Sequence, residues 1–410
     1  SQSTLESDIM LAPGNPNLGR EADSFDCGPL ILSGHQPGLF HPGVWAKNFA
    51  IDQLARELKR AGRQGSLAIQ VIIDNDLLRG STLVCPAGSV EEPFRASEPF
   101  DQFQEPRPYE RRFVVDRKLF GSFAERVQDR MRPFVANPLL AEFWGRACQG
   151  VDEGQPIGLA FARARHQIEL AWGGQTLEIP LSQLCESPEF RFFAGHLIYH
   201  ASEVAISYNQ RLGQYRRLHK IRNHAQPLPN LRAQAGWQET PLWFWTEEDP
   251  SRKSIWVRTN GRTLSIGDGE AEIAEVDGFR ENPEKIAAVL EEVSGAGCAI
   301  RPRALATTMF LRLFLADYFL HGIGGAKYDQ VTDLILFDLF GIPAPAFGVL
   351  SLTAWLPSPF PVFEAREIIH KQQEIREMYF QPERYLDRET LEVTQVSSKR
   401  KTKEKLLGCQ

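Results

Sequence analysis

Hydrophobic residues near the N-terminus form a short apolar run, then a helical pattern, then a second apolar run. Leu30–Ser33 predicts a strand, and apolar positions between residues 44 and 60 recur at the spacing of one helix face. Residues 67–73 (LAIQVII) are rich in β-branched side chains and predict a buried strand. Strand, helix and strand within roughly forty residues form a βαβ unit with parallel strands. We therefore expect an α/β fold in which the residues after both strands meet at one sheet edge.

Helical patterns dominate the middle of the chain, and short strands follow them. Apolar spacing predicts helices at about residues 117–133, 137–149, 154–171 and 189–221. The apolar stretches around Asn260-Gly261, a strong hairpin signal, predict a small antiparallel β insert. Further elements are expected as helices at residues 283–293, 304–319 and 328–339, a strand at 347–351, and a charged helix from Glu364.

These patterns divide the chain into four expected segments. They are a Rossmann-like core with helical excursions (residues 1–235), the β insert (236–282), a return to the core (283–358), and a C-terminal helix with a basic tail (359–410). Hydrophobic residues make up 42% of the chain and charged residues 24%, which is typical of a globular protein with a sizeable core.

Charge and cysteine usage narrow the function classes. The net charge of −6 argues against a nucleic-acid partner for the whole chain. The six cysteines form no CxxC pair, and the first 30 residues lack the apolar stretch of a signal peptide. Since no run approaches the ~18 apolar residues of a membrane span, we expect a cytoplasmic protein with no membrane partner.

The loop after the first strand is a candidate ligand site. Residues 34–38 (GHQPG) end the strand, and a second turn then leads into a helix. This arrangement presents backbone N–H groups and a positive dipole end to an anion. The alternative, given equal weight, is a tight turn whose histidine only bonds the backbone. The candidate ligand residues here are Gly34, His35, Gln36, Gly38, His41 and Lys47.

The second strand ends in Asp74-Asn75-Asp76. The alternative, given equal weight, is ordinary turn chemistry, since Asp and Asn are common at the ends of strands. The functional interpretation is that a buried strand delivers two carboxylates to the crevice, where they hold an amine, a sugar hydroxyl or Mg²⁺. The expected shared sheet edge with His35 favours this interpretation, and the three ligands stay open.

Residues 321–329 (HGIGGAKYD) form a glycine-rich segment that we expect to be a loop between two helices. Its spacing is not that of a Walker A loop, and without a preceding strand it is not a dinucleotide fingerprint. Glycines still allow close approach of a ligand, and a lysine at a helix start is better explained by an anion than by helix stability. The candidate ligand residues are Arg301, Arg303, Gly324, Gly325, Lys327 and Tyr328. No metal site is expected, because His196, His200 and Glu203 share a helix face but lack the HExxH pattern.

Two stretches carry a resemblance to a known family. GHQPGLFHPGVWAKNFAIDQLA, followed by a strand ending in IDND, resembles the opening of the bacillithiol-biosynthesis cysteine-adding enzymes. IRPRALATTMFLRLFLADYFLHGIGGAKYDQVTD resembles a second segment of that family, and PLWFW with NGRTLSI resembles its small connecting β region. The resemblance implies a nucleotidyltransferase-like Rossmann core and a C-terminal coiled coil that mediates homodimers. It also implies an enzyme that joins cysteine to a glucosaminyl-malate through an amide.

Carried over, the resemblance implies that the 34–38 loop lines the pocket and that Asp74 and Asp76 meet a polar substrate. The sequence departs from the family at Lys327, which replaces an acidic residue, and at IDND, which lacks a histidine. We therefore expect a divergent cysteine-ligase-like enzyme with a small-molecule substrate, with ATP or ADP and Mg²⁺ as the implied cofactors and His35, Asp74 and Asp76 as catalytic residues. Two alternatives stay open: a non-catalytic binding or dimeric scaffold homologue, and a sugar-nucleotide enzyme.

Overall fold

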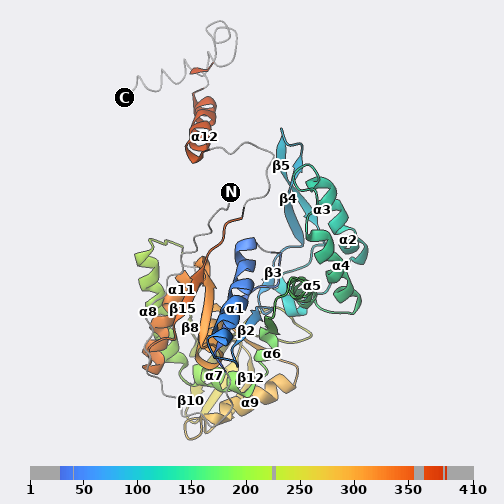
Figure 1. Ribbon diagram of the computed structural model, residues 1–410. Helices are drawn as coiled ribbons and strands as arrows, with labels where there is room; N and C mark the ends of the chain where they lie inside the picture. Colours follow the sequence, from blue (N-terminus) through green and yellow to red (C-terminus); the bar gives the residue numbers. More distant parts are fainter. Residues whose placement is uncertain (1–27, 40, 224–227, 355–363, 382–383, 386–410) are drawn as a thin grey trace, which may run out of the picture. The chain divides into compact units, whose positions relative to one another are not determined.

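The computed structural model describes residues 28–39, 41–223, 228–354, 364–381 and 384–385. The chain divides into a unit of residues 1–355 and a unit of residues 356–410. Helix α12 (Ala365–Phe380) belongs to the second unit, and all other helices and strands of the described residues belong to the first (Figure 1). Among the described residues, none of the helices combines the length and the apolar character needed to cross a membrane.

A five-stranded parallel sheet forms the centre of the first unit, so the predicted α/β class is confirmed (Figure 1). Its strands in spatial order are β15 (Phe347–Leu350), β14 (Tyr318–Gly322), β1 (Leu30–His35), β2 (Leu67–Ile72) and β7 (Leu177–Pro180). The predicted parallel pairing of β1 with β2 is confirmed over six residue pairs, from Leu30 with Leu67 to His35 with Ile72. Chain order runs outward from β1 in both directions, so it reverses between β1 and β14.

The segment before the glycine-rich residues differs from the prediction. The expected helix over 304–319 is instead α10 (Ala304–Phe310), a π-helical turn (Leu311–Leu315) and strand β14. Periodicity does not separate a short buried strand from a buried helix, and the apolar residues 318–320 fit both patterns. The prediction of a loop between two helices over 321–329 is therefore wrong. β14 ends at Gly322, and α11 (Ile323–Phe340) begins at the next residue.

Alternating side chains of the central strands face two different layers. Ile31 and Leu320 pack with Ile51 and Ala55 of helix α1 (Pro42–Arg60), which covers one face of the sheet. Leu32, Val71 and Phe319 point to the opposite face and join the largest core cluster. On that face, α11 contacts β14, β15 and helix α8 (Ala201–Leu218). Both sheet faces are thus covered, as expected for a parallel sheet.

The antiparallel sheet lies between two helical segments of the chain. Its strands are β8 (Ala233–Gln234), β9 (Trp237–Trp245), β10 (Lys253–Asn260), β11 (Thr263–Gly267), β12 (Glu272–Asp277) and β13 (Ala299–Pro302). The Asn260-Gly261 hairpin forms as predicted, with Gly261 at a φ of 61°. The sheet extends past residue 282, because β13 follows α9 (Glu284–Gly295) and pairs with β9. β13 then leads directly into α10.

The excursion after β2 contains both strands and helices. The prediction missed the hairpin of β4 (Thr82–Gly88) with β5 (Pro93–Pro99), as well as strand β7. The remaining elements are β3 (Leu77–Leu78), β6 (Arg107–Pro108), a 3₁₀ turn (Tyr109–Arg111), α2 (Arg117–Gly121), α3 (Phe123–Met131), α4 (Leu140–Asp152), α5 (Ile157–Ala171), α6 (Leu181–Leu184) and α7 (Pro188–Tyr199). The single helix expected over 189–221 is α7 and α8, which are separated by His200.

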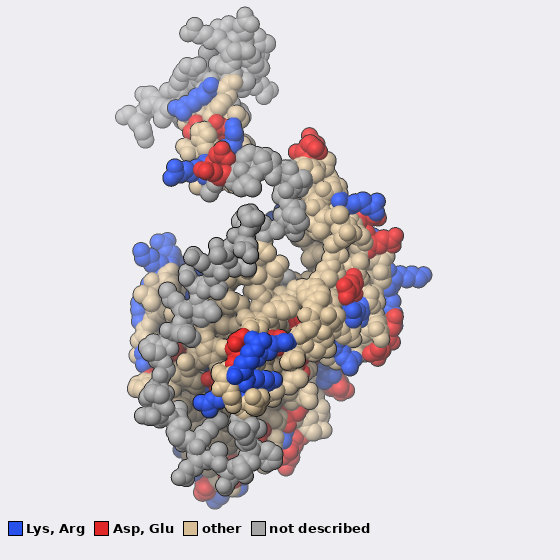
Figure 2. Space-filling view, in the orientation of Figure 1, with Lys and Arg blue, Asp and Glu red and all other residues tan. Residues whose placement is uncertain are grey.

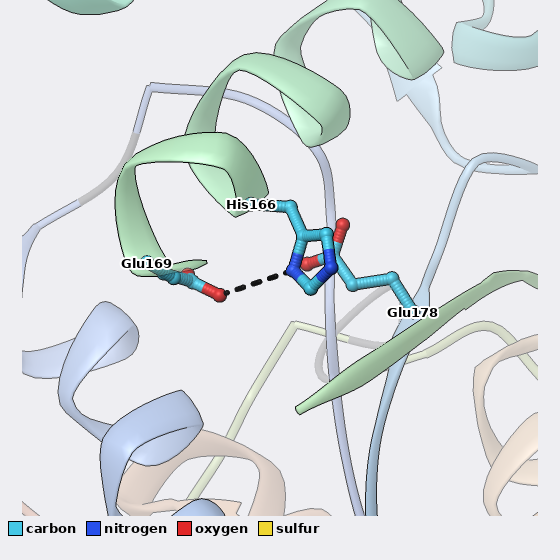
Figure 3. A group of neighbouring side chains, drawn as sticks. All are labelled: His166, Glu169 and Glu178. Atoms are coloured by element: carbon cyan, nitrogen blue, oxygen red, sulfur yellow. Dashed lines mark ion pairs between the residues drawn. The ribbon is translucent and has the colours of Figure 1, made fainter. Parts of the chain in front are cut away.

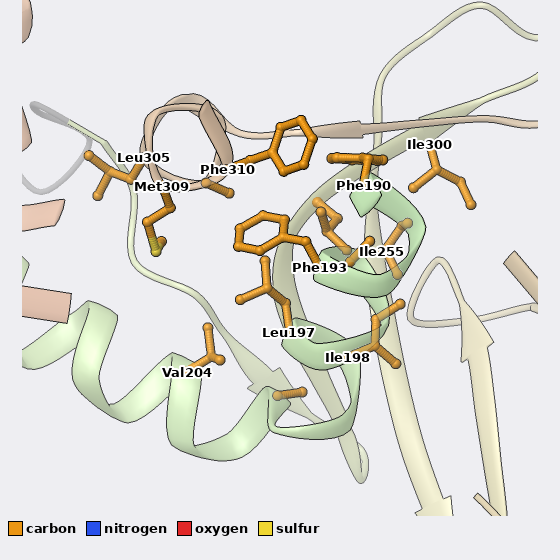
Figure 4. Close-up of a cluster of buried hydrophobic side chains, with 14 of the residues drawn as sticks. Phe190, Phe193, Leu197, Ile198, Val204, Ile255, Ile300, Leu305, Met309 and Phe310 are labelled. Atoms are coloured by element: carbon orange, nitrogen blue, oxygen red, sulfur yellow. The ribbon is translucent and has the colours of Figure 1, made fainter. Parts of the chain in front are cut away.

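The largest core cluster joins the two sheets through aromatic side chains. Figure 4 shows Phe190 and Phe193 of α7 close to Phe310 of α10. The ring centroids of Phe193 and Phe310 are 5.6 Å apart, and those of Phe190 and Phe310 are 5.2 Å apart.

On the face shown in Figure 2, Lys and Arg side chains lie among Asp and Glu side chains.

Replacing Phe193 with alanine tests this packing. Phe193 is fully buried, so Phe193→Ala is expected to lower the free energy of unfolding by about 3–5 kcal/mol. Its neighbour Phe192 is 56% exposed, and Phe192→Ala is expected to change stability by no more than about 0.5 kcal/mol. Chemical denaturation of both variants measures the difference. Equal losses in the two variants would contradict the packing.

Candidate functional site

Three strand ends lie next to one another at the carboxyl edge of the parallel sheet. They are the ends of β14, β1 and β2, which continue into the Gly322 turn, the 34–38 loop and the Asp74–Asp76 segment. At the usual strand spacing, the outer two of these ends are roughly 10 Å apart. Ligands of open parallel sheets bind at this edge, at the point where strand order reverses. Here that point lies between β1 and β14.

His35 belongs to a buried hydrogen-bond network. Its Nδ1 lies 2.9 Å from the carbonyl oxygen of Gln36, and its Nε2 lies 3.2 Å from Oδ1 of Asn48 on α1. Asn48 donates from Nδ2 to Oε1 of Glu169 on α5 at 2.8 Å, and Trp45 Nε1 donates to the same oxygen. Burial, followed by the positive charges of Arg165 and Lys47, lowers the pKa of His35 well below its usual value. The imidazole is therefore neutral near pH 7.

The other loop candidates have structural contacts. Lys47 is buried and donates from Nζ to the carbonyl oxygen of Gly34 at 2.8 Å, and burial lowers its pKa to about 8. The side chain of His41 caps α1 by accepting from the backbone N–H of Gly43 at 2.9 Å. A Cβ at Gly38 would lie 2.7 Å from the hydroxyl oxygen of Tyr109, so this close approach requires glycine.

Gln36 and Asp76 are brought together, as the shared sheet edge predicts. The amide of Gln36 donates to Oδ2 of Asp76 at 3.1 Å. Oδ1 of Asp76 accepts from the backbone N–H of Leu77 at 2.8 Å and lies 3.3 Å from Nη1 of Arg252. Asn75, between the two aspartates, is buried and donates to the carbonyl oxygen of Pro302. Asp76 therefore connects the loop to the antiparallel sheet.

Asp74 borders a cavity of about 190 Å³, whose lining also includes Glu110, Arg111 and Ser182. The hydroxyl and the backbone N–H of Ser182 both donate to the Asp74 carboxylate. Burial is the main cause that raises the pKa of Asp74 to about 6, and the nearby Glu110 charge adds to it. A buried carboxyl group that titrates near neutral pH beside a cavity is suited to general acid–base chemistry.

Arg301 and Arg303 are buried and form ion pairs with glutamates. Nε and Nη2 of Arg301 each lie 3.0 Å from an oxygen of Glu110, and its Nη1 lies 2.9 Å from Oε1 of Glu186. Arg303 donates to Oε1 of Glu239 at 2.6 Å, and its guanidinium carbon lies 3.9 Å from the ring centroid of Trp243. The Arg301 contacts join β13 to the excursion, and the Arg303 contacts join the start of α10 to β9.

The glycine-rich segment begins a helix. Gly322 is the N-cap of α11, and no side chain caps the first turn. Gly324 lies in that turn, with open space where a Cβ would be. Lys327 and Tyr328 follow and are exposed. In contrast to the prediction, this segment does follow a strand, which places an uncapped helix N-terminus at the point of strand-order reversal.

A second buried network lies beneath the start of α11. Asp329 accepts from Thr308 at 2.6 Å, lies 2.8 Å from Nε2 of His321, and forms an ion pair with Arg312. Burial alone would raise the pKa of Asp329, but the hydrogen bond and charge of His321, together with Arg312 and Thr308, lower it to about 2. Oδ1 of Asp333 also lies 2.7 Å from Arg312. This network fixes α11 against α10 and β14.

Sequence reasoning missed several residues that surround the candidates. Trp45 and Asn48 lie on α1 close to Lys47 in sequence, so their helical spacing was an available signal. Glu169 and Glu110 come from distant segments, and nothing local indicates the contacts of Glu169 with α1 or of Glu110 with Arg301. Across the described residues, the three-residue group that could hold a metal ion is His166, Glu169 and Glu178, not His196, His200 and Glu203.

Comparison with known proteins adds no assignment to this geometry. A scan against protein-family models and a search of curated proteins both found no match.

The raised pKa of Asp74 predicts how stability depends on pH. Because the folded state binds this proton more tightly, stability falls as pH rises from about 4 to about 6 and then levels off. Asp74→Asn removes this dependence. Its free energy of unfolding relative to wild type is therefore expected to improve by about 2 kcal/mol between pH 4 and pH 7. Chemical denaturation at each pH measures the difference, and a difference independent of pH would contradict the prediction.

Proposed function

We propose that the chain is a ligase-like or transferase-like enzyme with a nucleotidyltransferase-like Rossmann core, which binds a nucleotide or another phosphate-bearing ligand and a small polar substrate. The observation that carries this proposal is the reversal of strand order between β1 and β14, where the 34–38 loop and the Gly322 turn both begin. The family resemblance supports the same reaction class, with cysteine and an amino-sugar compound as the substrates to test first.

The first turn of α11 is the proposed phosphate site. Its backbone N–H groups have no side-chain cap, and the helix dipole favours an anion at this end. Gly324 is exposed, and no atom lies within 4 Å of where a Cβ would be, so this turn is open to a phosphate even with a small side chain at that position. Lys327, in the second turn, adds a positive charge near the bound anion. These features fit the phosphate groups of ATP or ADP, which would bring Mg²⁺ with them.

Asp74 is the proposed acid–base residue. In amide formation, a carboxylate first displaces a phosphate-containing leaving group from the nucleotide and becomes an acyl phosphate or adenylate. The amine then attacks the acyl carbon, the phosphate or nucleotide leaves, and the amine loses a proton. With a pKa of about 6, Asp74 is ionised at pH 7 and can accept that proton. The neutral His35 imidazole would orient the polar substrate.

Two substitutions at Gly324 test the phosphate site and separate binding from folding. Gly324→Asp puts a carboxylate in the first turn of α11. The helix dipole stabilises this negative charge, but the charge repels a phosphate. We expect it to keep or raise the Tm and to weaken ATP and ADP binding at least about tenfold, as measured by calorimetry with Mg²⁺. Gly324→Ala is the matched control, since its Cβ enters open space without adding charge.

The outcomes of this experiment are distinct. Binding lost in Gly324→Asp and retained in Gly324→Ala supports the site at α11. No nucleotide binding by the wild-type protein, or equal binding by both variants, removes it. Release of ADP or AMP that depends on cysteine and an amino-sugar acceptor, and that falls in Asp74→Asn, identifies the reaction as a ligation.

A non-catalytic binding homologue is the second candidate, and one observation favours it. The guanidinium groups expected to neutralise a reacting phosphate, on Arg301 and Arg303, already form buried ion pairs with glutamates. This candidate predicts ligand binding without turnover. It also predicts a homodimer that dissociates when residues after 360 are removed, which light scattering of the purified protein measures.

A further inference from the structure

His166, Glu169 and Glu178 form a compact group outside the proposed nucleotide site. His166 and Glu169 lie on α5, and Glu178 lies on β7 (Figure 3). One potential ligand atom from each residue lies within 4.8 Å of the other two. Nδ1 of His166 lies 3.6 Å from Oε2 of Glu169, which is longer than a hydrogen bond. The dashed line in Figure 3 marks this contact as a long ion pair between His166 and Glu169.

The glutamate oxygens divide into two sets. Oε1 of Glu169 accepts from Trp45 and Asn48 and lies 3.3 Å from Nε of Arg165. Oε1 of Glu178 pairs with the same guanidinium. Oε2 of Glu169, by contrast, has no hydrogen-bond partner. The Glu169 side chain is only 4% exposed, so this oxygen is also shielded from water. A buried carboxylate oxygen without a donor is costly, and it lies on the side facing His166.

The neighbouring strand adds an independent observation. Gln70 on β2 is the register partner of Glu178, so both side chains leave the sheet on the same face. Gln70 is fully buried, and its Oε1 also has no hydrogen-bond partner. Two buried acceptor oxygens without a donor, on Glu169 and Gln70, favour a cation.

We propose that His166, Glu169 and Glu178 bind a divalent transition-metal ion. His166 would supply Nδ1, Glu169 would supply Oε2, and Glu178 would supply a carboxylate oxygen. Arg165 and Asn48 keep their contacts with Oε1 of Glu169 and orient the ligand, as outer-shell partners do in metal sites. The site goes beyond the proposed nucleotide function, because none of its ligands belongs to the α11 turn.

Ligand chemistry selects the class of ion. One imidazole nitrogen with two carboxylate oxygens suits Zn²⁺, Mn²⁺ or Fe²⁺, whereas Mg²⁺ and Ca²⁺ prefer oxygen ligands alone. Three protein ligands leave a coordination position for water or substrate, as in catalytic zinc sites. Asn48 bonds both Glu169 and His35, so the ion would be linked to the 34–38 loop through two hydrogen bonds.

Metal titration of the full chain tests the site. Zn²⁺ is titrated by calorimetry without nucleotide, and Co²⁺ is followed by its visible absorption, which reports nitrogen–oxygen ligation. We expect one strong site in the wild-type protein and affinity at least about 100-fold weaker in Glu178→Gln and in His166→Ala. His219→Ala is the matched control, because His219 is exposed and lies at the C-terminal end of α8. The metal affinity of this variant is expected to equal that of wild type.

Each outcome decides the proposal. Loss of binding in Glu178→Gln and His166→Ala, with circular dichroism unchanged, supports it. No strong site in wild type overturns it. Zinc that stays bound in both variants also overturns it. In that case, loss of zinc binding in His196→Ala would assign the ion to His196 and His200, whose ring centroids are 4.5 Å apart. Because nucleotide is absent, a negative result leaves the test of the α11 turn unaffected.

Discussion

The pairing of β1 with β14 is the constraint on which the rest of the structure depends. These strands are 287 residues apart in sequence, yet Ser33 donates from Oγ to the carbonyl oxygen of Leu320 at 2.9 Å. At the other end, the backbone N–H of Leu30 donates to Asp317 at 2.9 Å. The pairing aligns the ends of both strands and brings two glycine-containing turns to one edge. Without it, the 34–38 loop and the start of α11 would not lie at the same edge of the sheet.

Buried cations hold the elements around that edge. Arg301, Arg303 and Arg312 are each almost fully buried, and each forms an ion pair with a carboxylate on another helix, strand or turn. A buried charge is tolerated when it is paired, whereas removal of one partner is strongly destabilising. These arginines therefore position the antiparallel sheet and α11. The groups to which we assign the proposed chemistry at this edge include Asp74, with its raised pKa, and the uncapped first turn of α11.

Local patterns predicted part of this structure well, for physical reasons that differ between elements. The β1, α1 and β2 unit was predicted from residues close in sequence, and the Asn260-Gly261 turn requires a conformation that glycine favours. β14 was missed because its apolar residues continue a helical pattern, and β7 was missed because it has only four residues. For the site, the 34–38 loop and Asp74 were identified, whereas Ser182, Glu110 and Glu169 were not, since their contacts form only on folding.

The sequence by itself determined the α/β class, the parallel β1–β2 pair and the shared sheet edge of the 34–38 loop and the Asp74–Asp76 segment, because each follows from spacing within one βαβ unit. Only the tertiary structure decided that the glycine-rich segment follows a strand and that Arg301 and Arg303 are engaged by glutamates. It also decided that Glu169 connects His35 to α5. The reason is that hydrogen bonds and ion pairs between segments far apart in sequence, from 64 residues for Arg303 with Glu239 to 191 for Arg301 with Glu110, leave no periodic signal in the chain.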